Sequence, residues 1–451
     1  MPSTKRLREL GLFEARVPRY TSYPPANHFT SGFGAQKVES WLHAIPSGGR
    51  VSLYLHIPYC RRLCWFCACR TQGTSTDRPL VPYLALLEKE LDLISERLRD
   101  DVIISQIHLG GGTPTLLPPD LIRRLGAKLA AFRPWADDLE FSVEIDPTEV
   151  DAARIEALSE IGMTRASIGV QDFDPEVQAA IGRLQPYETT RDVVQMLRAA
   201  GVGSVNMDIL YGLPFQTRTR MADSVRKVLS MSPDRVALYG YAHVPWMAKR
   251  QVLIPEGALP DAEERLVLFD TAREMFVEDG YAEIGIDHYA RTDDKMAAAA
   301  RDGSLHRNFQ GYTVDPSDVL IGVGASAISR YPQGFAQNNS ISSKYATAID
   351  GGRLATDRGH TMTAEDALRS AMIERLMCDM ALDTRQIAMT FGVPQSQIQD
   401  MTQRLRERFS DHIQVRDGAI RLTRDARLIA RLVAKELDAY LMPEGRHSQA
   451  L

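Results

Sequence analysis

Four of the five cysteines of this 451-residue chain lie within the segment "YLHIPYCRRLCWFCACRT" at 54–71: Cys60, Cys64, Cys67 and Cys69. Thiolates are preferred ligands of soft transition metals and of iron–sulfur clusters. The CxxxCxxC spacing supplies three thiolates from one loop, one fewer than a cubane cluster needs for all of its irons. The remaining iron would be open to another ligand, as the metal is in catalytic rather than structural sites.

Structural zinc is the main alternative for this cysteine cluster. Zinc sites usually draw their ligands from two separated pairs, and no second CxxC-like pair or closely spaced histidine pair follows in the sequence. A disulfide framework is disfavoured because the fifth cysteine, Cys378, lies far away. The pattern therefore favours an iron–sulfur cluster, and the spacing alone leaves open whether Cys69 is also a ligand.

The composition excludes several classes of protein. A net charge of −5 gives no overall attraction to nucleic acid or to an acidic membrane. The N-terminal "MPSTKRLREL" has no secretory pattern, and no apolar stretch approaches the roughly 20 residues that cross a bilayer. We therefore expect a cytoplasmic protein without nucleic-acid or membrane partners, in a compartment where stable disulfides are rare.

The elements that must position the cysteines form a repeating pattern. Short apolar runs alternate with helical segments, which predicts strands at 52–57, 103–109, 139–145, 165–170, 204–210 and 235–241. Six such units predict an α/β fold, an open, partial version of the parallel β/α barrel. We expect an N-terminal arm at 1–50, the partial barrel at 51–355 and a small, mainly helical domain at 356–451. This last part resembles a winged-helix module with a hairpin around Asp417-Gly418, and we expect it to act as a lid or packing element.

Alternation along the predicted strands indicates what the barrel contains. Leu139, Phe141 and Val143 share one face of their strand, whereas Glu140 and Glu144 share the other. A polar face could look at solvent in an antiparallel sheet, but the helices between the strands argue for a parallel sheet with a polar lumen. Chemistry is then expected at the C-terminal strand ends. The cysteine loop follows the first strand, and the glycine run "GGGTP" follows the second.

Together, these motifs resemble the radical S-adenosylmethionine (SAM) superfamily. Within it the chain resembles the family of oxygen-independent coproporphyrinogen III oxidases. The resemblance covers almost the whole chain through "RYTSYPP", "YLHIPYCRRLCWFCAC", "HLGGGTPTLL", "SVEIDP", "SIGVQDFDPEVQ", "NMDILYGLP", "YAHVP", "GIDHYA", "LHRNFQGYT" and "GVGASAIS". The cysteine triplet is common to the superfamily, whereas "YTSYP", Cys69 and "HRNFQGYT" are specific to the narrower family. Ala68 stands where the family often has glycine.

The resemblance implies a radical SAM type of partial barrel in which Cys60, Cys64 and Cys67 hold a [4Fe–4S] cluster. It implies SAM on the open iron, with a second SAM beside the first. The residues that it places around SAM are Tyr54, Phe66, Gly111, Gly112, Thr113, Glu144, Gln171, Arg183, Asp208, Ala242 and Ile328. Residues of the substrate site or its lid would be Arg19, Tyr20, Tyr23, Cys69, His306 and Asn308.

The resemblance also implies the reaction and its partners. The substrate would be a tetrapyrrole, coproporphyrinogen III, with two of its four propionates oxidatively decarboxylated to vinyl groups. A reduced flavodoxin- or ferredoxin-like protein would supply electrons to a monomeric enzyme. The alternative is a related haem-binding chaperone, but such relatives typically lack the fourth cysteine and the "YTSYP" arm that this chain has.

Overall fold

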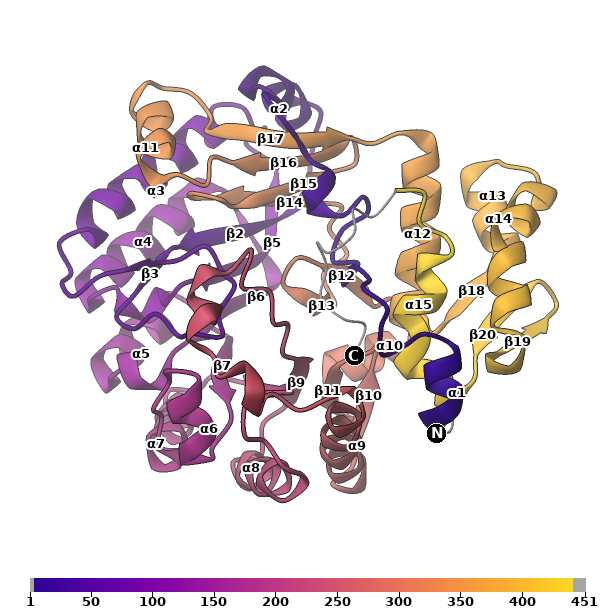
Figure 1. Cartoon of the computed structure of the whole chain (residues 1–451). Helices are drawn as coiled ribbons and strands as arrows, with labels where there is room; N and C mark the ends of the chain where they lie inside the picture. The colour runs from indigo at the N-terminus through magenta and orange to yellow at the C-terminus, as the bar shows by residue number, and fades with distance from the viewer. Residues whose placement is uncertain (1–3, 441–451) are drawn as a thin grey trace.

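A computed structural model describes residues 4–440 of the chain. A parallel sheet of six βα units forms the body of the molecule (Figure 1). Its strands are β2 (Arg50–Ile57), β5 (Ile103–Gly111), β6 (Trp135–Ile145), β7 (Arg165–Gln171), β8 (Ser204–Tyr211) and β9 (Arg235–Gly240). They pair in parallel in this order. All six predicted strands and the predicted fold class are therefore confirmed.

Helices cover the outer face of this sheet. The main ones are α3 (Leu80–Ser95), α4 (Pro119–Phe132), α5 (Ala152–Glu160), α6 (Pro175–Ala180), α7 (Tyr187–Ala199), α8 (Arg218–Ser230) and α9 (Ala262–Glu278). The apolar alternate residues of the strands pack beneath them, as Phe141 and Val143 of β6 do in the main core. This burial leaves the other face of each strand to the lumen, as the alternation predicts.

Further strands, most of them antiparallel, extend the sheet at both ends, and the sequence pattern did not indicate them. Beyond β9 lie β11 (His288–Arg291) and β10 (Tyr281–Ile284). Beyond β2 lie β14 (Val319–Val323), which is parallel to β2, and then β15 (Ile328–Tyr331), β16 (Gly334–Asn338), β17 (Thr356–Thr361) and β1 (Thr30–Ser31). The sheet thus includes β17 and β1, which lie outside the barrel range of 51–355 expected from the sequence.

The C-terminal region is mainly helical and shares its core with the N-terminal arm. Its elements are α12 (Ala364–Asp379), β18 (Ala381–Asp383), α13 (Thr384–Phe391), α14 (Gln395–Arg408), β19 (Ile413–Arg416), β20 (Ala419–Leu422) and α15 (Ala430–Lys435). The hairpin around Asp417-Gly418 is confirmed, with φ angles of 50° and 82° at its turn. Leu7, Leu12 and Val17 of the arm, which includes α1 (Thr4–Glu9), belong to the same apolar cluster as Met372 and Leu376 of α12.

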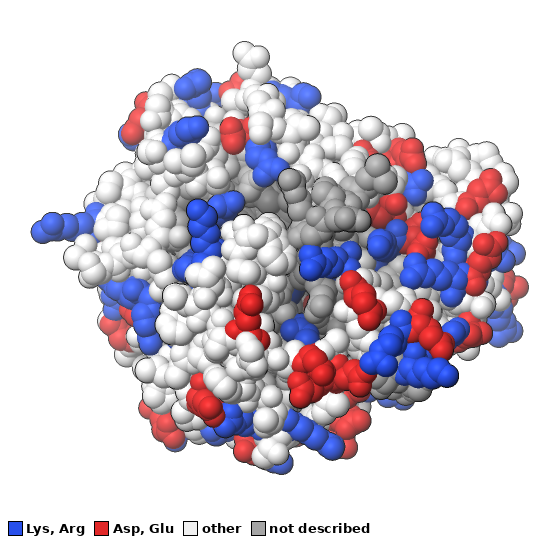
Figure 2. Space-filling view, in the orientation of Figure 1, with Lys and Arg blue, Asp and Glu red and all other residues white. Residues whose placement is uncertain are grey.

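The remaining α-helices and strands are short. They are α2 (Ala35–His43), β3 (Tyr59–Cys60), β4 (Gln72–Gly73), α10 (Lys295–Asp302), β12 (His306–Asn308), β13 (Gly311–Thr313) and α11 (Ser342–Asp350). Within residues 4–440 no helix is both long and apolar enough to cross a membrane. On the face shown in Figure 2, the C-terminal region carries acidic and basic side chains next to one another rather than a basic stripe.

A buried carboxyl group supports the loop that follows β14. Glu90 of α3 is 1% exposed and accepts hydrogen bonds from Gly324 N (2.7 Å), Asn338 Nδ2 (2.6 Å) and the Tyr345 hydroxyl (2.7 Å). Burial raises the pKa of Glu90 to about 7, although these hydrogen bonds oppose the shift. The loop leads directly into Ile328, the first residue of β15, so this network helps to fix one wall of the barrel.

Glu90 makes stability depend on pH, and we predict that Glu90→Gln removes this dependence. Between about pH 4.5 and the folded pKa of about 7, the unfolded chain ionises Glu90 while the folded chain keeps it protonated. The stability of the native protein therefore falls as pH rises through this window, by up to roughly 3 kcal/mol. Melting temperatures measured from about pH 5 to about pH 8 should show the variant gaining on the native protein as pH rises. A difference in melting temperature that stays constant with pH would contradict the prediction.

Candidate active site

The barrel lumen is a cavity of about 770 Å³ with polar walls. Its lining comes from alternate residues of successive strands: Tyr54 and His56 on β2, Gln106 and His108 on β5, Glu144 on β6, Arg165 and Ser167 on β7, Asn206 and Asp208 on β8, and Arg235 and Tyr239 on β9. This volume lies in the usual range of cofactor and substrate sites, roughly 300–1,000 Å³. The predicted polar lumen is thus confirmed.

Backbone hydrogen bonds hold the cysteine loop beside the glycine segment that ends β5. Gly112 N donates to Ile57 O and Thr113 N donates to Tyr59 O, both at 2.8 Å. A Cβ at Gly112 would lie 2.5 Å from the Tyr59 carbonyl oxygen, so only glycine fits this approach. The loop and the second strand end are therefore fixed to each other immediately before Cys60.

Further contacts fasten the far side of the loop. Trp65 N donates to Ile181 O at 2.9 Å, and Gln251 Nε2 donates to the carbonyls of Phe66 (2.7 Å) and Ala242 (3.1 Å). The loop is thus anchored to segments that follow β7 and β9. These hydrogen bonds within the protein therefore help to fix the positions of the three cysteines of the triplet.

The thiols receive donors suited to a negatively charged cluster. Arg183 Nη1 lies 3.5 Å from Cys64 Sγ, and Cys69 N lies 3.4 Å from Cys67 Sγ. Hydrogen bonds from Cys69, chiefly from its thiol and also from its backbone N–H, outweigh burial and lower the pKa of Cys67 to about 6. Such hydrogen bonds to sulfur stabilise thiolates and tune iron–sulfur clusters.

The arrangement of these thiols fits a cluster better than a single ion. Among residues 4–440 no three His, Cys, Asp or Glu side chains converge as ligands of one metal ion. In a [4Fe–4S] cluster each thiolate binds a different iron, so the sulfurs need not converge on one point. Three thiols on one anchored loop, with N–H donors to two of them, suit this donor set.

Carboxylates face the cavity close to the loop. Glu144 accepts from Gly111 N at 3.0 Å and lies 3.2 Å from His108 Nε2. Burial would raise the pKa of Glu144, but the His108 and Gly111 contacts outweigh it and the pKa is lowered. Glu144 is therefore an anionic acceptor beside the glycine segment.

Asp208 is the second carboxylate of this wall. It accepts from Asn206 Nδ2 at 2.8 Å and from Ser167 Oγ at 3.3 Å. Burial raises its pKa, partly against the Asn206 hydrogen bond, and the nearby Glu144 adds to the rise. The two carboxylates thus have pKa values shifted in opposite directions.

The predicted SAM-binding residues fall into two groups in space. Tyr54, Gly111, Glu144, Asp208 and Ile328 line the cavity, and the Tyr54 hydroxyl lies 3.0 Å from His56 Nδ1. The others lie outside this lining: Phe66, Gly112, Thr113, Gln171, Arg183 and Ala242. The contacts above place most of this second group at the cysteine loop. Arg183 also pairs with Asp146 at 3.2 Å.

The residues predicted for the substrate site or its lid lie in three different places. Arg19, Cys69 and Asn308 line the cavity. Tyr20 and Tyr23 instead line a second cavity of about 480 Å³, where the Tyr20 hydroxyl donates to Asp438 at 3.1 Å. His306 lies 3.3 Å from Glu374 of α12 and lines neither cavity.

Sequence reasoning missed several residues of the lumen. His108, Arg165, Arg235, Tyr239 and Arg307 line the cavity without having been singled out. For the first four, the signal was available, since each occupies an inward position in the period-2 pattern of its strand. His288 also lines the cavity, with its Nδ1 2.7 Å from Asp287 Oδ1.

Comparison with known proteins agrees with this architecture. The model of the radical SAM superfamily matches residues 54–228. An oxygen-independent coproporphyrinogen III oxidase of Paracoccus denitrificans is 52% identical over the full length of both chains, and one of Pseudomonas aeruginosa is 39% identical over 95% of this chain and 94% of its own. The structure of the coproporphyrinogen III oxidase of Escherichia coli, a radical SAM enzyme, superposes with a TM-score of 0.90 at 34% identity, covering 95% of this chain and all of that one.

The fold, the anchored cysteine triplet and these similarities define a radical SAM oxidoreductase, a class that implies a [4Fe–4S] cluster and SAM. More narrowly, the chain belongs to the family of oxygen-independent coproporphyrinogen III oxidases.

We predict that Gly112→Ala weakens cluster binding. The added Cβ would collide with the Tyr59 carbonyl and displace the loop just before Cys60. After anaerobic reconstitution the variant should hold less than about half of the iron of the native protein. Gly203→Ala is the matched control, because a Cβ there meets only Thr164 O at 4.0 Å. Full iron content in Gly112→Ala would show that the close approach does not position the cluster.

Proposed function

We propose that this enzyme decarboxylates two propionates of coproporphyrinogen III to vinyl groups without oxygen and releases protoporphyrinogen IX and CO₂. The observation that carries the proposal is the position of the cysteine loop at the mouth of a polar lumen, with Cys69 in the lining of that lumen. A cluster on Cys60, Cys64 and Cys67 would then face a cavity of cofactor and substrate size.

When bound by Cys60, Cys64 and Cys67 and by the residues around them, the cluster and SAM would supply the radical chemistry that removes a hydrogen atom from a propionate. Loss of CO₂ from the resulting substrate radical, with one electron passing to a separate one-electron acceptor, would complete each vinyl group. The protein's own residues have to bind, orient and shield the reactants.

Several side chains suit these tasks. Glu144 and Asp208 are acceptors for amino or hydroxyl groups of SAM, and the backbone of Gly111 allows a ligand to approach closely. Arg183, buried and donating to Cys64, suits a carboxylate of a SAM molecule beside the loop. A second SAM molecule beside the first stays part of the proposal.

The N-terminal arm and the β12–β13 hairpin are positioned to cover the substrate. Thr21, Asn308 and Phe309 line both the lumen and the second cavity and so separate the two. These segments would exclude water and oxygen during turnover. The reduced flavodoxin- or ferredoxin-like donor, the monomeric state and the cytoplasmic location stay predictions.

An anaerobic assay tests the reaction. Reduced protein with SAM should convert coproporphyrinogen III to protoporphyrinogen IX with release of CO₂, and Cys60→Ala should abolish this conversion because a cluster thiolate is lost.

Cys69→Ala should keep the iron content and lose activity by roughly tenfold to a hundredfold, the usual effect of removing a group next to a metal ligand.

Two outcomes would contradict parts of this account. Stoichiometric haem binding without turnover would support the haem-chaperone function instead. Loss of iron from Cys69→Ala would show that Cys69 is a cluster ligand.

A further inference from the structure

Arg307 of β12 is a buried arginine in the wall of the lumen. It is 6% exposed and lines both the lumen and the second cavity. Its guanidinium group lies over the ring of Tyr312 on β13, with Cζ 4.4 Å from the ring centroid, and Tyr312 lines the lumen too. Because Arg307 belongs to the wall itself, a ligand in the lumen does not have to leave the lumen to reach it.

The protein leaves hydrogen-bond donors of Arg307 unused. Its Nε and Nη1 are buried, and neither has a hydrogen-bond partner within residues 4–440. The carboxylate that forms an ion pair with it, Asp287, lies 3.8 Å from Nη1, which is beyond hydrogen-bond distance. Buried donors are nearly always satisfied, and charged ones are the most costly to leave without an acceptor. The guanidinium group of Arg307 therefore lacks an acceptor that a ligand could supply.

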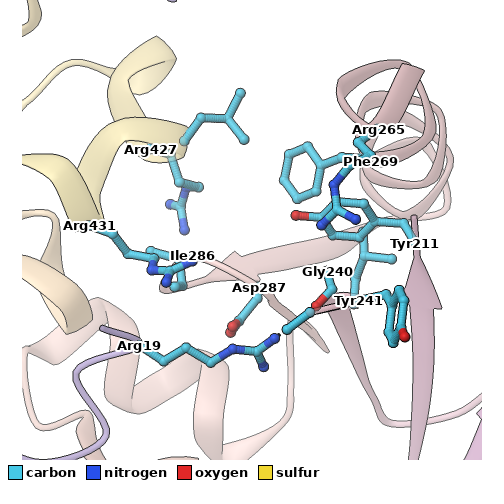
Figure 3. Close-up of a pocket in the computed structure, with 13 residues that line it drawn as sticks. Arg19, Tyr211, Gly240, Tyr241, Arg265, Phe269, Ile286, Asp287, Arg427 and Arg431 are labelled. Carbon is cyan, nitrogen blue, oxygen red and sulfur yellow. The ribbon is translucent and has the colours of Figure 1, made fainter. Parts of the chain in front are cut away.

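Asp287 is shared and lies behind this part of the wall. His288 Nδ1 is 2.7 Å from Asp287 Oδ1. Burial would raise the pKa of Asp287, but Arg307, His288 and Arg19 outweigh it and lower the pKa to about 2. Asp287 does not belong to the lining of the lumen; it lines a separate cavity of about 50 Å³, as Arg19 and Arg431 do (Figure 3). Its negative charge thus orients the cations of the wall from outside the lumen.

Arg19 of the N-terminal arm is the second cation at this place. It also lines the lumen, and its Nη2 donates to Gly240 O at 2.8 Å. Its Cζ lies 5.7 Å from the centroid of the Tyr239 ring. Figure 3 shows Arg19 extending past Asp287 toward Gly240. A carbonyl oxygen satisfies a donor without neutralising its charge, so Arg19 and Arg307 share the one carboxylate of Asp287.

The arginines on the strands of the lumen differ from these two. Arg165 Nε lies 3.0 Å from Glu140, and Arg235 Nε lies 2.9 Å from Asp294. Each of them has a carboxylate at short distance that the chain itself supplies. The pair Arg19 and Arg307 is therefore the better place for a carboxylate that comes from a ligand.

We propose that Arg307, together with Arg19, binds a propionate of the tetrapyrrole. This inference rests on the proposed function, which brings two carboxylate-bearing ligands to the site, SAM and coproporphyrinogen III. Arg183 suits the carboxylate of a SAM molecule beside the cysteine loop, whereas the propionates of the substrate need basic groups elsewhere in the lumen. Guanidinium groups bind carboxylates through two parallel hydrogen bonds.

The contact would position the substrate. Arg307 comes from the β12–β13 hairpin and Arg19 from the N-terminal arm, so a propionate between them would bind both segments. Holding one propionate at this place also fixes which edge of the macrocycle faces the cysteine loop. Arg307 is thus a positioning residue for the tetrapyrrole.

Equilibrium binding of coproporphyrin III, a stable porphyrin with four propionates, to the cluster-loaded protein tests this directly. We expect Arg307→Gln to raise the Kd about tenfold, the effect of losing one charge-assisted hydrogen bond. Arg307→Lys keeps the charge and should restore part of the affinity. Arg19→Gln should weaken porphyrin binding in the same direction; Arg19 is half-buried, so this variant serves if Arg307→Gln misfolds.

Arg133→Gln is the matched control for removing a buried arginine. Arg133 is 8% exposed, its Cζ lies 5.6 Å from the centroid of the Phe132 ring, and Asp100 lies 3.6 Å from its Nη2. It precedes β6, at the end of the sheet opposite to the cysteine loop. Its porphyrin Kd should not change. Iron content and melting temperature of each variant establish that the protein is folded.

Binding of SAM separates the two sources of a carboxylate. We expect the Kd for SAM to stay within about twofold in Arg307→Gln. Weaker SAM binding with unchanged porphyrin binding would assign Arg307 to the carboxylate of SAM and overturn the propionate site.

These measurements need no turnover, so they also separate this inference from the proposed function. Weaker porphyrin binding by the glutamine variants would support the propionate site even if the native enzyme shows no turnover, a result that would overturn the proposed function alone. Normal turnover with unchanged porphyrin binding in both glutamine variants would overturn the propionate site alone.

Discussion

The hydrogen bonds from Gly112 N to Ile57 O and from Thr113 N to Tyr59 O hold the cysteine loop against the end of the second barrel strand. The rest of the site depends on this approach, because it brings a loop rich in thiols to the mouth of the lumen. Glycine is required at Gly112, where a side chain would meet the Tyr59 carbonyl. The same segment supplies Gly111 N to Glu144, so the loop, the glycine segment and the first lumen carboxylate form one connected unit.

The parallel strands determine where the other residues of the site lie. Their apolar residues pack under the helices, and polar residues from each of the six strands line the same lumen. The carboxyl ends of the strands meet at one rim, where the cysteine loop, the N-terminal arm and the β12–β13 hairpin converge. The arm reaches this rim because its apolar residues, such as Leu7 and Leu12, belong to the core of the C-terminal region. A chemically demanding reaction is thereby enclosed by segments from both ends of the chain.

The sequence was most informative where the pattern is local. The six parallel strands, the polar lumen and the hairpin at Asp417-Gly418 followed from alternation and turn chemistry. The antiparallel strands beyond β2 and β9 did not, since they are short and gain their stability from pairing at the sheet edges. The sequence also could not indicate that α1 packs in the C-terminal core, or that Arg19 and Arg431 line one cavity, because contacts between residues so far apart have no local signal. Inward positions such as His108 and Arg235 were detectable by periodicity, but one sequence does not distinguish a ligand-binding side chain from a structural one.

The central claim is that the three cysteines hold an iron–sulfur cluster with one iron open to SAM. Electron paramagnetic resonance of the anaerobically reduced protein, recorded with and without SAM, tests it most directly. The account predicts the signal of a reduced [4Fe–4S] cluster that shifts when SAM is added, because SAM binds the iron that lacks a thiolate. A cluster signal that SAM leaves unchanged, or protein that takes up zinc and never iron, would contradict it.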